Sequence, residues 1–286
     1  MINEIVKSLK SNNFIIEESL FFKGNKSEFW HSTVLDDNQN PVSAGFGSNL
    51  NMSRKIAISE FLERTFYHKI KAEQNNDKEN WGLDIIPTAC GFAAGFDRPN
   101  TIHRSIAEAT ERWVMSKWID DGYYIREVPL SEINSELDEV SNFFMSYFDR
   151  VLFFEKDVVV NLTGINFKIR VVQTMGLKGN GIYPGSSAQI ENNIWQHALL
   201  ESVRHLLLVK NNNPINRFPE NKIRFFSNNS NLALNVISKA KITDWPIPKV
   251  LMHKSIGLEN NSYFIARTIL SGWNSWHLGP IERFLY

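Results

Sequence analysis

Four glutamates, Glu60, Glu63, Glu108 and Glu111, have the residue type and the spacing to bind a metal ion. The members of each pair are three residues apart, so on a helix both carboxylates would project from one face about one turn apart. Like charges at that distance repel each other unless a cation lies between them. Carboxylate oxygens are hard ligands of the kind that Mg²⁺ takes, and no Cys or His pattern nearby favours zinc. The spacing therefore predicts a Mg²⁺ site, and it indicates nucleotide binding because protein-bound Mg²⁺ commonly keeps positions for phosphate oxygens.

The two carboxylate pairs belong to an internal repeat. A shift of 48 positions lays AGFGSNLNMSRKIAISEFLER (44–64) on FAAGFDRPNTIHRSIAEATER (92–112). In both copies a glycine, Gly47 or Gly95, precedes the first glutamate by 13 residues. A looser third copy begins at YPGSSAQ and continues through WQHALLESVRHLLL, where Arg204 takes the place of the second glutamate after Glu201. The repeat predicts three units, each with a glycine-rich turn that leads into a helix with an acidic face.

The pattern has a simpler interpretation, which is a solvated helix surface. E-x-x-E-R is common on exposed helices, so one copy alone would not indicate a site. Two copies in register, each at the same distance behind a glycine turn, favour the site. Arg64 and Arg112 remain open between two roles, phosphate binding and pairing with the neighbouring glutamate.

In these three segments the chain resembles the YcaO family, whose members use ATP and Mg²⁺ to activate peptide backbone amides. The resemblance rests on three features within about residues 40–210, which are GFAAG followed by AEATER, AGFG followed by SEFLER, and GSSAQ followed by ALLESVR. The resemblance implies azoline or thioamide products in a ribosomally synthesised peptide. It also implies roles for site residues. The metal ligands would be Glu60, Glu63, Glu108 and Glu111, and the nucleotide would be held by Arg54, Arg64, Arg112, Glu201 and Arg204.

Some features depart from the family pattern. Many members have G-K-G in the first turn, where this chain has Gly45-Phe46-Gly47, so the phosphate-facing cation would have to come from Arg54 or Lys55. Arg54 near a helix N-terminus could reach phosphate, and the alternative is that it projects into water. The chain also ends in GPIERFLY instead of a Pro-rich tail. The alternative function is therefore a degenerate nucleotide-binding scaffold that supports a partner enzyme.

The resemblance also implies partners. The substrate would be a precursor peptide with a leader, and a second protein would present the leader or donate sulfur. A homodimer is compatible with these expectations.

Composition limits the class of protein. The chain has 286 residues, 43% hydrophobic and 22% charged, and equal numbers of acidic and basic residues at 31 each. No net charge draws it to nucleic acid or to an anionic membrane. The single cysteine, Cys90, excludes an internal disulfide framework and fits a cytoplasmic protein. No apolar run is long enough to span a bilayer and no signal peptide is expected, so we predict no membrane or nucleic-acid partner.

The elements that must position the site follow from periodicity. Strands are expected at 13–22, 27–37, 83–88, 151–162, 167–177, 247–256 and 262–270, and helices at 1–11, 101–118, 131–149 and 191–210. Thr101 is the expected N-cap of the second acidic helix, and residues 211–222 are expected to be a loop or lid. Strands mixed with helices predict an α+β fold. It is α/β-like in that a strand, a turn and a helix follow one another in each copy of the repeat. We expect one YcaO-like domain over residues 1–286. This domain could consist of two subdomains, of about residues 1–125 and 126–286.

Overall fold

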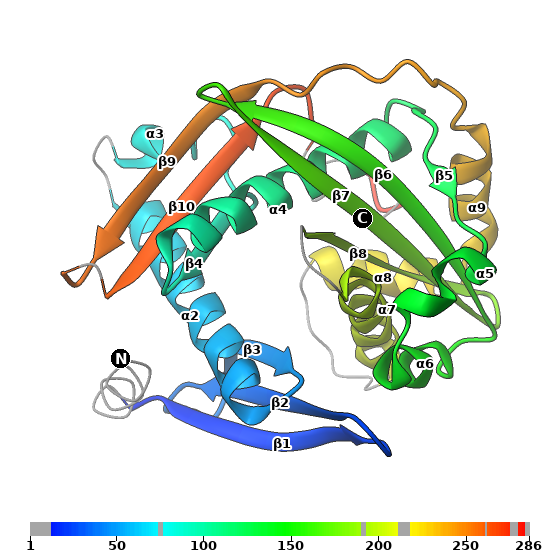
Figure 1. Ribbon diagram of the computed structural model, residues 1–286, viewed down its shortest axis with the longest axis horizontal. Helices are drawn as coiled ribbons and strands as arrows, with labels where there is room; N and C mark the ends of the chain where they lie inside the picture. Colours follow the sequence, from blue (N-terminus) through cyan, green and yellow to red (C-terminus); the bar gives the residue numbers. More distant parts are fainter. Residues whose placement is uncertain are drawn as a thin grey trace. The chain divides into compact units, whose positions relative to one another are not determined.

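The computed structural model describes residues 13–73, 77–189, 193–210, 218–260, 262–274 and 280–283 (Figure 1). The chain forms two compact units. Unit 1 comprises Met1–Ile106 and Met252–Ile269, and unit 2 comprises Ala107–Leu251 and Leu270–Tyr286. Both combine helices with antiparallel sheets, which confirms the α+β class. The expected subdomain boundary near residue 125 remains a prediction. The expected helix over residues 1–11 lies outside the described residues.

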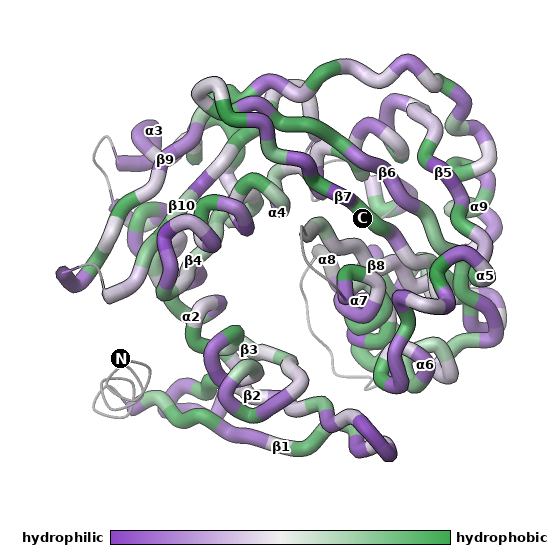
Figure 2. Tube along the Cα trace, in the orientation of Figure 1, coloured by the Kyte–Doolittle hydropathy of each residue, from purple (hydrophilic) through white to green (hydrophobic). Residues whose placement is uncertain are grey.

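The first sheet of unit 1 is an antiparallel meander of three strands, β1 (Ile15–Lys23), β2 (Glu28–Leu35) and β3 (Pro41–Gly47). The Asp36 carboxylate closes the turn before β3, because it accepts the N–H groups of Asn38 at 2.9 Å and Asn40 at 2.8 Å. Strand β1 has hydrophobic residues at both ends of a hydrophilic middle (Figure 2). The two strands expected over 13–22 and 27–37 are confirmed.

Helix α2 (Leu50–Ala72) packs against β3 and β2 and also against β4 of the second sheet. It begins after Asn49, whose side chain accepts the Met52 N–H at 2.9 Å and so caps the first turn. Its first half buries Ala57, Ile58 and Phe61 against the meander. Its second half enters a separate core with Trp81, Phe92 and Ile265. One helix therefore supplies apolar residues to both cores of unit 1.

The second sheet of unit 1 has the order β4-β10-β9. Its strands are β4 (Phe92–Gly95), β9 (Val250–Leu258) and β10 (Tyr263–Leu270), and the short helix α3 (Asp77–Asn80) precedes them. The strands expected over 247–256 and 262–270 are confirmed. The strand expected over 83–88 is wrong, because the buried Arg267 guanidinium donates to the backbone carbonyls of Trp81, Ile86 and Thr88 in place of a strand ladder.

Unit 2 contains a four-stranded antiparallel sheet, β5 (Arg126–Glu127), β6 (Arg150–Leu162), β7 (Ile165–Lys178) and β8 (Gly181–Gln189), in that order. Helix α7 (Ile194–Lys210) packs on β8 and β7, and it confirms the helix expected over 191–210 from Ile194 onward. The remaining helices are α5 (Leu130–Ile133), η1 (Asn134–Glu136), α6 (Glu139–Met145), α8 (Phe218–Phe226) and α9 (Ser230–Lys239).

Two helix predictions for unit 2 are corrected. The single helix expected over 131–149 is broken at Leu137, which is extended, and α6 begins again after Asp138, whose carboxylate caps it by accepting the Ser141 N–H at 2.7 Å. The loop expected over 211–222 is wrong from Phe218 onward, where α8 begins, and residues 211–217 lie outside the described part.

The three glycine-rich segments are largely strands, and the prediction that they are turns is wrong except at Gly91, which lies in a turn with a positive φ of 78°. They form the end of β3, all of β4 and most of β8. A Cβ on Gly45 would lie 2.2 Å from the Ser53 carbonyl oxygen of α2, and one on Gly185 would lie 2.0 Å from the Ala198 carbonyl oxygen of α7. The glycines are therefore required because each following helix packs directly on its own strand.

The repeat also shows in the hydrogen bonds that join strand to helix. In each of the three copies of the repeat, one strand carries the glycines and the neighbouring strand of the same sheet carries a buried hydroxyl. That hydroxyl oxygen lies 2.8 Å from a hydroxyl oxygen on the following helix. The three pairs are Ser32 with Ser53, Thr268 with Ser105, and Thr174 with Ser202. Each buried hydroxyl is thus satisfied by its partner, and the pair fixes the helix on its sheet.

Helix α4 (Arg98–Ile119) carries the second glutamate pair and runs from unit 1 into unit 2. Its N-cap is Asp97, whose carboxylate accepts the Asn100 N–H at 2.9 Å, and not Thr101 as expected. Thr101 lies within the first turn and donates its hydroxyl to the Asp97 carbonyl at 2.7 Å. The helix begins three residues earlier than expected because Pro99 is tolerated in a first turn, where no intrahelical N–H bond is lost.

Candidate functional site

Glu111 is the most buried of the four predicted metal ligands, with 9% of the residue exposed. It projects from α4, and its carboxylate oxygen Oε1 accepts a hydrogen bond of 2.6 Å from the Ser186 hydroxyl of β8. The same oxygen lies 3.9 Å from Nε of Arg112. Strand β8 therefore orients this carboxylate.

Helix α7 presents a second charged pair in the same unit. Arg204 donates to Glu201 at 2.6 Å, across one helical turn. Burial by itself would raise the pKa of Glu201, but the charges of Arg204, His205 and Arg112 and the Arg204 hydrogen bond together lower it. Glu201 is therefore ionised at neutral pH, and Arg112 of α4 is near enough to act on it electrostatically.

His205 belongs to this cluster and was missed in the sequence. Burial lowers the pKa of its imidazole, against the opposing effects of Glu201 and of the Pro184 carbonyl. Its Nδ1 lies 2.7 Å from that carbonyl oxygen, so the neutral ring donates Nδ1–H to β8. Two features of the sequence pointed to His205. It directly follows Arg204, and Pro184, whose carbonyl it contacts, belongs to the same third copy of the repeat. Ser186, in the same GSSAQ segment, was missed as well.

Unit 2 thus brings together four of the predicted residues, Glu111, Arg112, Glu201 and Arg204, with Ser186 and His205 beside them. We call this set the mixed-charge cluster. Two carboxylates are hard oxygen ligands that suit a divalent cation, and two guanidiniums suit the oxygens of a phosphate. The donor set fits a metal-bound polyphosphate better than a site for a soft metal.

Glu60 and Arg64 lie in unit 1 and are joined to each other. Arg64 donates to the Glu60 carboxylate at 2.5 Å and to the Val42 carbonyl at 2.7 Å. The other Glu60 oxygen accepts the Ala44 N–H at 2.9 Å. Arg64 therefore pairs with its neighbouring glutamate in the structure, which is one of the two roles considered for it. The Glu60 carboxylate is held against β3.

Arg54 is held by Glu18 of β1. Two guanidinium nitrogens lie 2.7 and 2.9 Å from the two carboxylate oxygens, a bidentate pair whose hydrogen bond raises the pKa of Arg54. The alternative that Arg54 projects into water is wrong, because its side chain is only 25% exposed. Its role as a phosphate ligand remains a prediction, and that role requires phosphate to displace Glu18.

Glu63 and Glu108 are both half-buried. Glu60 and Glu63 belong to unit 1, while Glu108 and Glu111 belong to unit 2. Within the described ranges, no group of three or more His, Cys, Asp or Glu side chains is gathered as a metal site. The convergence of the four carboxylates remains a prediction.

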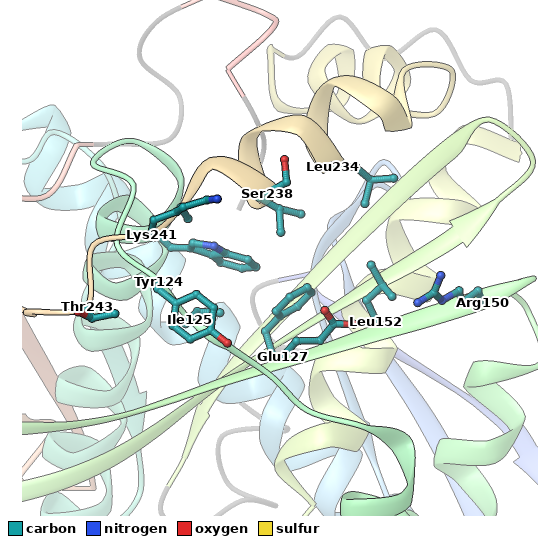
Figure 3. A pocket seen from close by; sticks show the side chains of 13 residues that line it. Tyr124, Ile125, Glu127, Arg150, Leu152, Leu234, Ser238, Lys241 and Thr243 are labelled. Carbon is teal, nitrogen blue, oxygen red and sulfur yellow. The ribbon is translucent and has the colours of Figure 1, made fainter.

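A cavity of about 610 Å³ lies in unit 2, and none of the nine predicted residues lines it (Figure 3). It is bounded by α9, by Trp118 of α4 and by strands β5 and β6. The single cysteine, Cys90, is buried. No helix in the described part of the chain is long and apolar enough to cross a membrane.

Comparisons with known proteins give a fold and no family by sequence. No protein-family model matches the chain, and no curated protein matches it. Among solved structures, it is similar to YcaO from Methanopyrus kandleri bound with AMPPCP and Mg²⁺, with a TM-score of 0.58 and 14% identity over 96% of this chain and 91% of that one. It is also similar to a heterocyclase in complex with substrate and cofactor, with a TM-score of 0.56 and 9% identity over 96% of this chain and 52% of that one, so it spans about half of that heterocyclase. At these identities the comparison shows the fold alone, and the chain has a YcaO-like fold.

Proposed function

We propose that this chain is an ATP- and Mg²⁺-dependent enzyme that phosphorylates a backbone amide of a peptide. The observation that carries the proposal is the mixed-charge cluster, in which the second and third repeats place two carboxylates and two arginines together. The YcaO-like fold supports it, since a protein with this fold binds AMPPCP and Mg²⁺. The heterocyclase of the same fold, bound to substrate and cofactor, supports the choice of a peptide-modifying reaction.

In this proposal the residues of the chain bind and orient the reactants. Glu111 is a ligand on the metal side of the nucleotide, with Glu60, Glu63 and Glu108 as the further carboxylates, and Glu201 belongs to the nucleotide pocket. Ser186 keeps Glu111 in one orientation through its 2.6 Å hydrogen bond. Arg112 and Arg204 bind phosphate oxygens and stabilise the charge that develops on them. When bound, Mg²⁺ neutralises charge between the β- and γ-phosphates.

The chemical step follows from this arrangement. The amide oxygen of the substrate attacks the γ-phosphorus, and the bond to the ADP oxygen breaks. A Cys, Ser or Thr side chain, or a sulfur donor, then adds to the amide carbon, and phosphate leaves with the former amide oxygen. The product is an azoline in the first case and a thioamide in the second. The proposal includes a leader-bearing substrate, a leader-presenting or sulfur-donating partner, and a cytoplasmic location.

A second candidate is a scaffold that binds nucleotide without turnover, and Phe46 favours it. The ring of Phe46 stacks on the ring of His31, with 4.2 Å between the ring centroids. Its centroid lies 5.3 Å from that of Phe21 and 5.9 Å from that of Phe29. The position where many family members have lysine is therefore occupied by a packed aromatic ring, and no cation extends from it.

Phosphate release separates the two candidates. The purified protein is incubated with Mg²⁺, ATP and the short peptides encoded beside its gene, and the peptides are analysed by mass spectrometry. An enzyme releases phosphate only with a peptide that loses one water per azoline or exchanges an amide oxygen for sulfur. Nucleotide binding without phosphate release, with every peptide and neighbouring protein present, would establish the scaffold instead.

A further inference from the structure

The cavity of unit 2 lies away from the mixed-charge cluster and has the character of a binding site. Its volume of about 610 Å³ is in the range of ligand sites. Its walls are largely apolar and include the buried side chains of Trp118, Ile125 and Phe154. Leu234, Ile237 and Ser238 of α9 line it at helical spacing, so this face of α9 is turned to the cavity.

A second cavity, of about 300 Å³, adjoins the first. Tyr124 and Thr243 line both. The second cavity is more polar, and its lining includes Lys156 and Trp245, which form a cation–π contact of 5.0 Å. Because Tyr124 and Thr243 line both cavities, we treat the cavities together and call them the α9 groove. Two neighbouring cavities, one largely apolar and one more polar, suit an extended chain better than a compact small molecule.

Strands β5 and β6 form one wall of this groove. β5 pairs with β6 only at Phe154 and Glu155. Arg150 and Leu152, which precede these residues on β6, line the first cavity. Arg150, Leu152 and Phe154 alternate along β6 and so point to one face of the sheet, and an extended peptide in the groove would lie over that face.

Charge selects the kind of peptide. Arg150 and Lys241 lie at two ends of the first cavity, with Glu127 between them (Figure 3). Among the described residues, none of the three has an ion-pair partner. Two cations against one carboxylate give the rim a net positive charge, which favours acidic residues in the occupant.

We propose that the α9 groove binds an extended segment of the peptide substrate in which apolar side chains are flanked by acidic ones. The inference rests on the proposed function, because it assigns the substrate class of that enzyme to this groove. The segment held here is separate from the amide that reacts, so the groove contributes affinity and register and takes no part in the chemical step.

Selection from random peptides displayed on phage tests the groove without knowledge of the natural substrate. The full-length protein is expected to retain sequences enriched in Leu, Ile or Phe with Asp or Glu on either side. One retained peptide, labelled with fluorescein, is then titrated by anisotropy. Lys241→Glu is expected to weaken its binding about tenfold, because it reverses a rim charge. Lys239→Glu, an exposed position of α9 that does not line the groove, is the matched control and is expected to change nothing.

Two tryptophan variants, which act through side-chain volume and not through charge, test the groove even where salt screens the charge effects. Ser238→Trp fills the groove and is expected to abolish binding, while Lys239→Trp, at an exposed position that does not line the groove, leaves it intact. Retained peptides without acidic residues, or equal effects of the paired variants, would overturn the proposal. Calorimetry of Mg²⁺ and ATP on the same proteins separates the two claims. Peptide binding without ATP binding would remove the proposed function, and ATP binding without selective peptide binding would remove the groove.

Discussion

At the residue scale, each charged side chain of the candidate site is held by a particular neighbour. The Ser186 hydroxyl orients Glu111, the Ala44 N–H orients Glu60, and Arg204 pairs with Glu201. A carboxylate that is fixed before the ligand arrives loses less conformational entropy on binding it. The neighbours also show which charges are already compensated, as Arg54 is by Glu18.

Glu111→Gln removes one charge from the mixed-charge cluster while its amide oxygen can still accept the Ser186 hydroxyl. We expect the affinity for ATP in the presence of Mg²⁺ to fall at least about tenfold, since a hard anionic ligand is lost. The melting temperature should stay within about 2 °C. Calorimetry and thermal denaturation measure both, and Glu127→Gln, an exposed carboxylate in the same unit, is the control. Unchanged ATP affinity would place Glu111 outside the site.

Arg54→Ala breaks the bidentate pair with Glu18, whose side chain is 22% exposed. We expect the free energy of unfolding to fall by about 1 kcal/mol, and Glu18→Ala to have the same effect. The free energy of unfolding of the double variant should lie within a few tenths of a kcal/mol of that of each single variant, because the two residues share one interaction. Urea denaturation measures these values. A tenfold loss of ATP affinity with unchanged stability would show instead that Arg54 leaves Glu18 for phosphate.

The residue types and spacing predicted which side chains belong together within unit 2. Glu111, Arg112, Glu201 and Arg204 came from two copies of a repeat that are far apart in sequence. Their pairings could not be predicted, because Ser186 and Glu18 come from strands whose register depends on the whole sheet. The choice between phosphate and glutamate as the partner of Arg64 likewise depends on the position of the Val42 carbonyl, which spacing does not give.

At the element scale, the three repeats are strands followed by helices that pack closely on them. The sequence signals located each helix, since Gly45, Gly95 and Gly185 all precede one. They did not show that the glycines are in strands, because a glycine needed for close packing and one needed for a turn look alike in sequence. Caps carry a separate ambiguity, because Asp97 and Thr101 are both residue types that cap helices and only Asp97 caps α4.

Gly185→Ala tests the close packing of α7 on β8. The added Cβ would lie 2.0 Å from the Ala198 carbonyl oxygen, so the helix must shift. We expect a loss of about 1–3 kcal/mol in the free energy of unfolding, as for other overpacked sites. Gly179→Ala is the control, because its Cβ meets nothing within 4 Å and only the positive φ of 56° adds strain. Equal losses in the two variants, measured by urea denaturation, would contradict direct packing.

The pH dependence of stability tests the burial of His205 on α7. Burial lowers its pKa, so below the ordinary value of about 6.5 the unfolded chain takes up more protons than the folded one. Stability should therefore decrease as the pH falls from about 6.5 toward the lowered pKa of the folded protein. His253, whose pKa burial also lowers, acts in the same direction. His205→Asn should flatten the decrease, while the exposed His68→Asn should not. A pH profile of denaturation midpoints that is identical in all three proteins would contradict a buried, neutral His205.

At the scale of the whole molecule, the predicted carboxylates are divided between two compact units. Unit 1 contains Glu60 and Glu63, and unit 2 contains Glu108 and the mixed-charge cluster. The discontinuous units could not be predicted from the chain, because β9 and β10 come late in the sequence and complete a sheet with β4. The fold class was predictable, since it follows from alternating strand and helix periodicities.

The central claim is that these carboxylates bind ATP through Mg²⁺, and calorimetric titration of ATP tests it most directly. Without metal, carboxylates near the nucleotide would repel the triphosphate. We predict measurable binding with Mg²⁺, and loss of that binding when EDTA removes the metal. Binding of equal affinity in EDTA, or no binding in either condition, would contradict the account.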